Sequence, residues 1–104
     1  MSALPSTSAS CPAWGEALEL FRRDLLAAGT APRTLNAYEK DLGQLRAWAD
    51  GSGLGVDKVT HKDLRRYAAS LSATGRAPAT VARKLAAIRG FYGFLLRTGR
   101  VGQN

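Results

Sequence analysis

The chain has 104 residues, a length that fits one domain large enough to bury its own hydrophobic core. A hydrophobic fraction of 45% excludes an intrinsically disordered chain, and a single cysteine excludes an intrachain disulfide or a thiolate metal cluster. The formal net charge of +7 favours a polyanionic partner, either nucleic acid or an anionic membrane surface. No apolar run approaches the roughly 18 residues of a membrane span, and the N-terminus lacks the pattern of a signal peptide. We therefore expect a cytoplasmic protein with no membrane partner.

The charge is distributed unevenly along the chain. Residues 1–63 contain seven Lys and Arg against eight Asp and Glu, whereas residues 64–104 contain eight Lys and Arg and no acid. A charge that served only solubility would have no reason to segregate in this way. The second segment is therefore the main candidate for contact with a polyanion.

Residues 1–12 are rich in Ser, Ala and Pro and have no periodicity, which predicts a flexible tail. The folded domain is expected over residues 13–104. Apolar residues at helical spacing predict a first helix from about Ala13 to Ala28, ended by Gly29. Its buried stripe consists of Trp14, Leu18, Phe21 and Leu25.

The second predicted helix begins at Pro32 or Arg33 and continues to about Asp50. Its apolar face consists of Leu35, Tyr38, Leu42, Leu45, Trp48 and Ala49, and its polar face of Arg33, Asn36, Ala37, Lys40 and Gln44. Glu39 and Asp41 would repel phosphate if they pointed at it, so we place both at the edge of the polar face, with Asp41 paired to a basic neighbour. We interpret Tyr38 as a core tyrosine with its hydroxyl at the rim.

A glycine-rich loop over residues 51–55 closes the second helix, and Val56 and Val59 are expected to tuck under the domain. Thr60 and Asp63 have the spacing of a capping box at the start of a third helix. The side chains that this helix is expected to bury are Leu64, Tyr67, Ala68 and Leu71.

The fourth predicted helix spans about residues 78–97. Its apolar face consists of Val81, Leu85, Ile88, Tyr92 and Leu95, widened by Phe91 and Phe94, and its other face of Thr80, Arg83, Lys84 and Ala87. The second set is short or basic, which suits a DNA major groove, because that groove is wide enough to admit a helix. An ordinary solvated basic face is the alternative interpretation.

The second and fourth helices start in the same way. Residues 29–34 read Gly-Thr-Ala-Pro-Arg-Thr, and 46 residues later residues 75–80 read Gly-Arg-Ala-Pro-Ala-Thr. The residue before each Pro is Ala, whose side chain accepts nothing from the first amides of the helix. Those amides and the positive end of the helix dipole stay available for an anion such as phosphate. Two matched starts indicate two helices that address one polyanion.

Three stretches carry a family resemblance. They are Ala31-Pro32-Arg33-Thr34-Leu35-x-x-Tyr38-x-x-Asp41-Leu42, Val59-Thr60-x-x-Asp63-Leu64-Arg65-x-Tyr67, and Pro78-x-Thr80-x-x-Arg83-x-Leu85-x-x-Ile88-Arg89-x-Phe91-Tyr92-x-Phe94-Leu95. Together they resemble the N-terminal domain of tyrosine recombinases, closest to the Xer and phage-integrase-like branch, over about residues 14–104. The resemblance implies an all-α, compact four-helix SAM-like core-binding domain. In that family this domain grips one side of the DNA duplex while a separate catalytic domain grips the other.

The resemblance implies that the second and fourth helices face double-stranded DNA, which agrees with the polar faces above. The expected DNA-binding residues are Arg33, Thr34, Asn36, Ala37, Lys40, Arg76, Ala79, Thr80, Arg83, Lys84 and Ala87. The family often has Ser where this chain has Ala31 and Ala77, and a longer or basic side chain at the position of Ala79. Other recombinase protomers would be further partners in a full-length protein.

The resemblance also bears on catalysis. The family's chemistry needs a tyrosine nucleophile and a cluster of Arg, Lys and His from the catalytic domain, beyond where this chain stops. Tyr38, Tyr67 and Tyr92 all lie in apolar stripes, so none is a credible nucleophile. We expect a chain that binds DNA without cutting it and that uses no cofactor or metal.

Two other functions compete with DNA binding. In the first, the apolar first and third helices dock a protein and the basic charge is incidental; the absence of acids after Asp63 favours DNA instead. The second is a small self-contained enzyme, for which the sequence offers no carboxylate pair, metal-ligand spacing or His-activated nucleophile.

Overall fold

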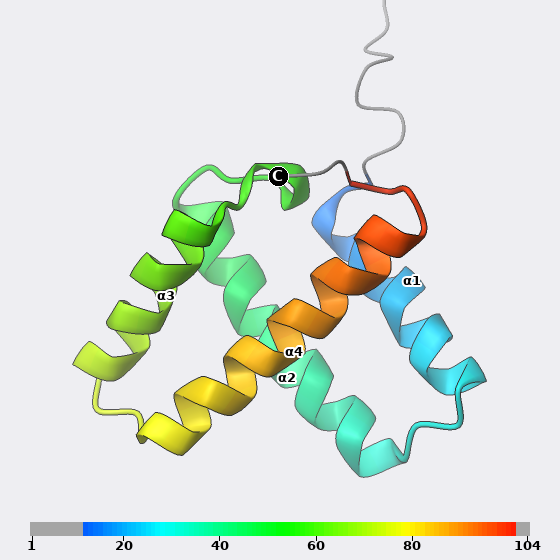
Figure 1. The fold of residues 1–104 in the computed structure, drawn as a ribbon, viewed down its shortest axis with the longest axis horizontal. Helices are drawn as coiled ribbons and strands as arrows, with labels where there is room; N and C mark the ends of the chain where they lie inside the picture. The colour runs from blue at the N-terminus through cyan, green and yellow to red at the C-terminus, as the bar shows by residue number, and fades with distance from the viewer. Residues whose placement is uncertain (1–11, 102–104) are drawn as a thin grey trace, which may run out of the picture.

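A computed structural model describes residues 12–101 as an assembly of helices (Figure 1). The elements are α1 (Trp14–Ala27), α2 (Pro32–Gly51), the short 3-10 helix η2 (Val56–Lys58), α3 (His61–Ala73) and α4 (Pro78–Arg97). No strand occurs in this part of the chain, so the predicted all-α class is confirmed, and the predicted helix boundaries agree to within a residue. The predicted tail, apart from Pro12, lies outside the described residues.

The helices α2 and α4 cross at the centre of the molecule, with α1 and α3 on opposite sides of the crossing (Figure 1). Contacts join α1 to both α2 and α4, and α3 to α4. The N-terminal ends of α2 and α4 both point to the lower edge of this view, whereas η2 lies at the upper edge. The two matched helix starts are therefore presented at one edge of the molecule.

The four α-helices end in the same way. Each is followed by a glycine with positive φ, and these are Gly29, Gly53, Gly75 and Gly99. After α1, the amide of Gly29 donates to the Leu26 carbonyl and the amide of Thr30 donates to the Leu25 carbonyl. This pair of bonds is the Schellman arrangement, in which a left-handed residue lets the chain leave the helix with its last carbonyls satisfied.

The third helix begins with the capping box that the sequence predicts. The Asp63 amide donates to Thr60 Oγ1 at 3.1 Å, and the Thr60 amide donates to Asp63 Oδ2 at 2.9 Å. The hydrogen bond from the Thr60 amide, followed by the one from its side chain, lowers the pKa of Asp63. The start of α3 is therefore fixed by its own first turn.

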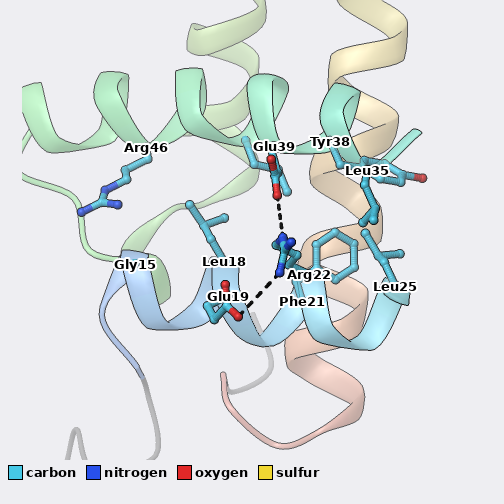
Figure 2. Close-up of a pocket in the computed structure, with 11 residues that line it drawn as sticks. Gly15, Leu18, Glu19, Phe21, Arg22, Leu25, Leu35, Tyr38, Glu39 and Arg46 are labelled. Carbon is cyan, nitrogen blue, oxygen red and sulfur yellow. Dashed lines mark hydrogen bonds and ion pairs between the residues drawn. The ribbon is translucent and has the colours of Figure 1, made fainter. Parts of the chain in front are cut away.

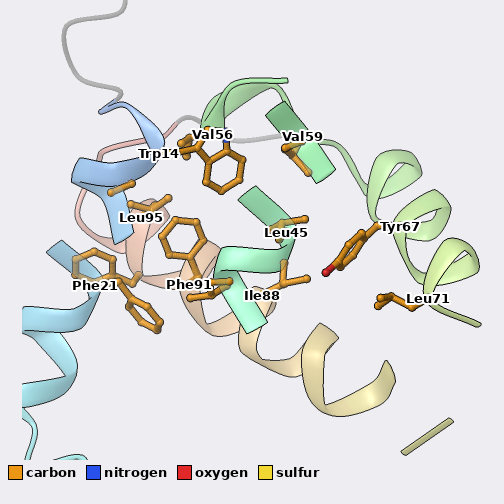
Figure 3. Packing of buried hydrophobic residues seen from close by; sticks show 14 of the residues in the cluster. Trp14, Phe21, Leu45, Val56, Val59, Tyr67, Leu71, Ile88, Phe91 and Leu95 are labelled. Atoms are coloured by element: carbon orange, nitrogen blue, oxygen red, sulfur yellow. The ribbon is translucent and has the colours of Figure 1, made fainter. Parts of the chain in front are cut away.

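The core is built around Phe91 of α4, which is fully buried (Figure 3). The ring of Phe21 lies edge-on to Phe91 with centroids 5.6 Å apart, and Trp14 stacks on Phe91 at 6.2 Å. Val56 and Val59 are buried in the core, as predicted. Each large apolar side chain buried in this way contributes about 1.5–3 kcal/mol to folding.

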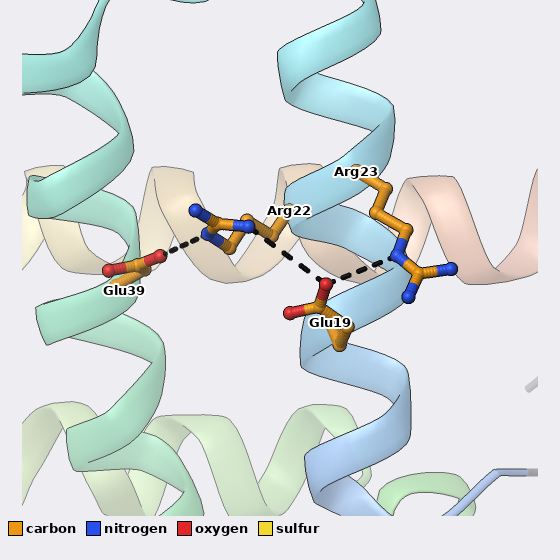
Figure 4. Close-up of polar contacts among 4 residues, drawn as sticks. All are labelled: Glu19, Arg22, Arg23 and Glu39. Carbon is orange, nitrogen blue, oxygen red and sulfur yellow. Dashed lines mark hydrogen bonds and ion pairs between the residues drawn. The ribbon is translucent and has the colours of Figure 1, made fainter.

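The helices α1 and α2 are joined on their outer side by exposed ion pairs, which we call the surface network: Glu19, Arg22, Arg23 and Glu39 (Figure 4). Arg22 Nε lies 2.8 Å from Glu39 Oε2, and Arg23 Nε lies 3.1 Å from Glu19 Oε2. A pocket lies beneath the Arg22–Glu39 pair (Figure 2). Apolar residues that line it include Leu18, Phe21, Leu25, Leu35, Tyr38 and Leu42. Tyr38 is half-buried with its ring against Phe21, which agrees with its interpretation as a core tyrosine.

Candidate nucleic-acid interface

The starts of α2 and α4 have matching geometry as well as matching sequence. The residue before each helix, Ala31 or Ala77, is extended, with φ and ψ of −63° and 146° in the first and −65° and 147° in the second. Neither start has a side-chain cap hydrogen bond, and neither has an acid in its first turn. The first amides of both helices are therefore free to receive an anion.

Most of the residues expected on α2 lie where a ligand could reach them. Arg33, Thr34, Asn36 and Lys40 are exposed, and Ala37 is half-buried. Arg33 and Lys40 form no ion pair with any residue in the described range. Their charges are thus not neutralised within this range.

The residues expected before and at the start of α4 are accessible too. Arg76 and Ala79 are exposed, and Thr80 is half-buried. Arg76 has no ion-pair partner among residues 12–101. Arg83, one turn further on, keeps 52% of its side chain exposed while it contacts Asp41.

Two residues expected on the same face of α4 are buried instead, so that expectation is wrong for Lys84 and Ala87. Each is only 2% exposed. The physical reason is helical periodicity: Lys84 falls three residues after Val81 and four before Ile88, and both of those side chains are in the core. Ala87 precedes Phe91 by four residues and lies on the same buried side. In this structure neither side chain can touch a ligand on the surface of α4.

Lys84 is buried because Asp41 of α2 is buried opposite it. Lys84 Nζ donates to Asp41 Oδ1 at 2.8 Å and also to the Gln44 side-chain carbonyl, while Arg83 donates from one terminal nitrogen to Asp41 Oδ2 at 2.5 Å. We call these four residues the Asp41 cluster: Asp41, Gln44, Arg83 and Lys84. The predicted pairing of Asp41 with a basic neighbour is confirmed, but its predicted place at the edge of a polar face is wrong, since only 1% of the residue is exposed.

The Asp41 cluster affects the pKa of a buried tyrosine of α3, Tyr67. Tyr67 packs on Trp48 with ring centroids 5.3 Å apart, and its hydroxyl, which points inward, has no hydrogen-bond partner within residues 12–101 (Figure 3). Burial raises the pKa of Tyr67, and the negative charge of Asp41 raises it further. A raised pKa and a buried hydroxyl are the opposite of what an activated nucleophile needs.

The remaining tyrosines are also engaged in packing. The Tyr92 hydroxyl donates to the Val56 carbonyl at 2.7 Å, and Tyr38 lies against Phe21. No group of three or more His, Cys, Asp or Glu side chains that could hold a metal ion occurs in the described part of the chain. None of its helices combines the length and the apolar character required to cross a membrane.

Comparison with known proteins assigns this arrangement to a family. Residues 18–99 match the family described as "Phage integrase, N-terminal SAM-like domain". A tyrosine recombinase XerC of Pelobacter propionicus is 41% identical over 93 residues, which are 86% of this chain and 30% of that protein. A tyrosine recombinase XerD of Rhizobium meliloti is 38% identical over 71 residues, 68% of this chain and 23% of that protein. A tyrosine recombinase XerD of Pseudomonas aeruginosa is 34% identical over 79 residues, 76% of this chain and 26% of that protein.

These relatives are much longer than the matched segment, since the chain covers less than a third of each. No solved structure matches the chain. The family match spans most of the described residues, including the two helix starts and the Asp41 cluster. This chain belongs to the phage integrase N-terminal SAM-like domain family.

Proposed function

We propose that this domain binds duplex DNA as part of a site-specific tyrosine recombinase or integrase, and that it clamps one side of the recombination site through α2 and α4. The proposed contact residues are Arg33, Thr34, Asn36, Ala37, Lys40, Arg76, Ala79, Thr80 and Arg83. Lys84 and Ala87 are left out of this set because they are buried.

The observation that carries the proposal is the pair of matched, uncapped helix starts at one edge of the fold. Free amides at a helix N-terminus suit phosphate oxygens. Arg33 and Arg76 lie beside the two starts, and neither is ion-paired within the described residues. Cations of this kind supply the salt-dependent part of DNA affinity by releasing counterions from the phosphates they neutralise.

We infer that DNA strand cleavage is carried out by another part of the recombinase. The three tyrosines of this chain are packed or hydrogen-bonded within the fold: Tyr38 lies against Phe21, Tyr67 against Trp48, and the Tyr92 hydroxyl donates to a backbone carbonyl. We infer that the domain contributes affinity and position on the duplex, together with other recombinase protomers in the cytoplasm, and that it needs no cofactor or metal.

The test is a titration of a fluorescently labelled duplex with the purified chain at several salt concentrations. Affinity should fall steeply as salt rises, with a slope of about −0.9 per neutralised phosphate on a log–log plot. Arg33→Ala and Arg76→Ala should each reduce that slope by about 1. The matched control is Arg23→Ala, which removes the same charge from the 71%-exposed arginine of the surface network and should leave the slope unchanged.

A second candidate function is protein docking, and one observation favours it. An apolar groove runs between α3 and α4, lined in part by Leu64, Ala68, Leu85 and Leu96, and Leu96 is 45% exposed. If that groove carried the function in place of α2 and α4, the chain would bind no duplex even at low salt. Equal losses from Arg23→Ala and Arg33→Ala would also count against the α2 and α4 surface.

A further inference from the structure

Arg83 is held by one end only. A single terminal nitrogen donates to Asp41 Oδ2, while half of the side chain remains exposed to solvent. A guanidinium carries five N–H donors in a rigid planar fork. The donors not used by Asp41 are therefore fixed in direction and still available to a ligand.

The charge of Asp41 does not require Arg83. Lys84 Nζ lies 2.8 Å from Asp41 Oδ1, and both side chains are only 2% exposed, so one buried cation already neutralises the buried anion. Arg83 adds a second cation to the same carboxylate, and the cluster carries a surplus positive charge at the surface of α4. The contact with Asp41 therefore fixes the orientation of the Arg83 guanidinium.

We propose that Asp41 is a positioning residue, which holds the Arg83 guanidinium in the orientation in which it reads one base pair of the bound duplex. This inference rests on the proposed DNA-binding function. A free arginine has many rotamers and must lose that freedom on binding, whereas a tethered one is ordered in advance. A bidentate contact to guanine also demands a fixed plane, so loss of the tether costs discrimination more than it costs general affinity.

Retention of the tether during binding is favoured over its release. If Arg83 left Asp41 for DNA, the buried Oδ2 would lose its hydrogen bond, and no other donor to it is present among the described residues. If Arg83 turns its free edge outward, every buried bond of the cluster stays in place.

The chain offers a matched set of variants. Asp41→Leu and Lys84→Met each break the buried ion pair, but only the first removes the acceptor that tethers Arg83. The double variant Asp41→Leu/Lys84→Met keeps the wild-type net charge, leaves no buried ion pair, and also frees Arg83, because Leu has no acceptor. Arg83→Ala marks the full loss of the side chain. The probe is a duplex library randomised in sequence, from which bound molecules are sequenced, together with one fixed duplex titrated against salt.

The wild-type chain should prefer one base at one position, and Arg83→Ala should lose that preference. The double variant should lose it as well, with discrimination at that position reduced by about tenfold. Its affinity for the fixed duplex and its salt slope should stay as in the wild type, because its net charge is unchanged. Lys84→Met should keep the preference, because Asp41 still holds Arg83.

Three results overturn the inference while leaving DNA binding intact. In the first, the double variant discriminates between bases as well as the wild type does. In the second, Lys84→Met loses as much discrimination as the double variant. In the third, binding depends on salt, but no base preference of the wild-type chain is lost in Arg83→Ala. Absence of duplex binding at low salt instead defeats the proposed function itself.

A measurement on the unmodified chain makes the test independent of how stable the variants are. In the free wild-type chain, the Nε–Hε group of Arg83 should show an NMR order parameter near that of rigid backbone, about 0.85. A value below about 0.6, typical of a flexible group, would mean that Asp41 does not fix the guanidinium.

Discussion

The surface network and the Asp41 cluster use the same residue types to join neighbouring helices, yet they differ in balance and burial. The surface network has two arginines and two glutamates, all with exposed side chains. The Asp41 cluster has two cations and one carboxylate, and two of these three side chains are buried. The first arrangement is electrically neutral and the second carries a net positive charge.

This difference indicates that the surface network between α1 and α2 and the Asp41 cluster between α2 and α4 have different roles. Exposed ion pairs contribute little to stability, and a neutral network attracts no polyanion. A buried ion pair is costly to break on one side, because the remaining charge has no solvent. A surplus charge next to it keeps a long-range attraction for phosphate. The surface network between α1 and α2 is therefore solvated, whereas the Asp41 cluster joins α2 to α4 and, under the proposed function, also offers a charge to DNA.

The largest expected effect comes from breaking the buried pair on one side. Asp41→Ala leaves Lys84 buried without its anion and should lower the free energy of unfolding by about 3–5 kcal/mol. Urea denaturation followed by circular dichroism measures this. A loss no larger than that of Glu39→Ala, on the surface network, would mean that the two sets of charges are equivalent.

The next effect concerns DNA rather than folding. Arg83→Ala should weaken duplex binding by about 1–3 kcal/mol if a base contact is lost, and Arg22→Ala, the matched change in the surface network, should leave it unchanged. Arg22→Ala should lose no more than about 1 kcal/mol of stability, because it removes an exposed ion pair. Arg83→Ala should lose about 1–3 kcal/mol, because it leaves the buried Asp41 Oδ2 without a hydrogen bond. Binding titrations and thermal melts on the same preparations give both quantities. Unchanged DNA binding by a folded Arg83→Ala chain would show that this face of α4 is only solvated.

A smaller change tests the surroundings of the Asp41 cluster. Tyr67→Phe removes a buried hydroxyl that has no partner within the described residues, so it should raise the free energy of unfolding by about 1 kcal/mol. Chemical denaturation of the variant against the wild type checks the sign. Destabilisation would reveal that the hydroxyl makes a hydrogen bond.

The smallest effect is expected in the surface network. Glu39→Gln removes one charge of the 2.8 Å pair with Arg22, and both side chains are about half exposed. Stability should fall by about 0.2–1 kcal/mol at low salt and by less at high salt, because solvent ions screen exposed pairs. Denaturation curves at two salt concentrations measure it. A loss that persists at high salt would contradict the comparison.

Sequence patterns predicted the helices well because local signals dominate there. Gly29 and Gly75 end helices by their positive φ, and Thr60 with Asp63 starts one by a capping box, and all of these act within a single turn. The all-α class and the four helices follow from these signals and from apolar periodicity.

The Asp41 cluster could be predicted only in part, because charged residues are rarely fully buried and are therefore expected on the surface. The charge of Lys84 predicts a place on the polar face, although its spacing from Val81 and Ile88 places it in the core stripe. Asp41 likewise falls four residues before the buried Leu45. Two opposite charges at core-facing positions of two helices are the signal that could have revealed the pair. Which two helices pack together, however, depends on the tertiary structure and cannot be deduced from this signal.

The loop that separates the two halves of the chain is fastened from both sides. Each half is a helical hairpin, α1 with α2 and α3 with α4, whose connector ends one helix on a glycine and starts the next at a proline. From the first hairpin, Trp14 Nε1 donates to the Leu54 carbonyl at 3.0 Å; from the second, the Tyr92 hydroxyl donates to the Val56 carbonyl at 2.7 Å. The segment that carries η2 lies at the edge opposite the starts of α2 and α4 (Figure 1). Under the proposed function these two bonds affect DNA binding from a distance, because the spacing between the two helix starts depends on how the hairpins are held together at their far end.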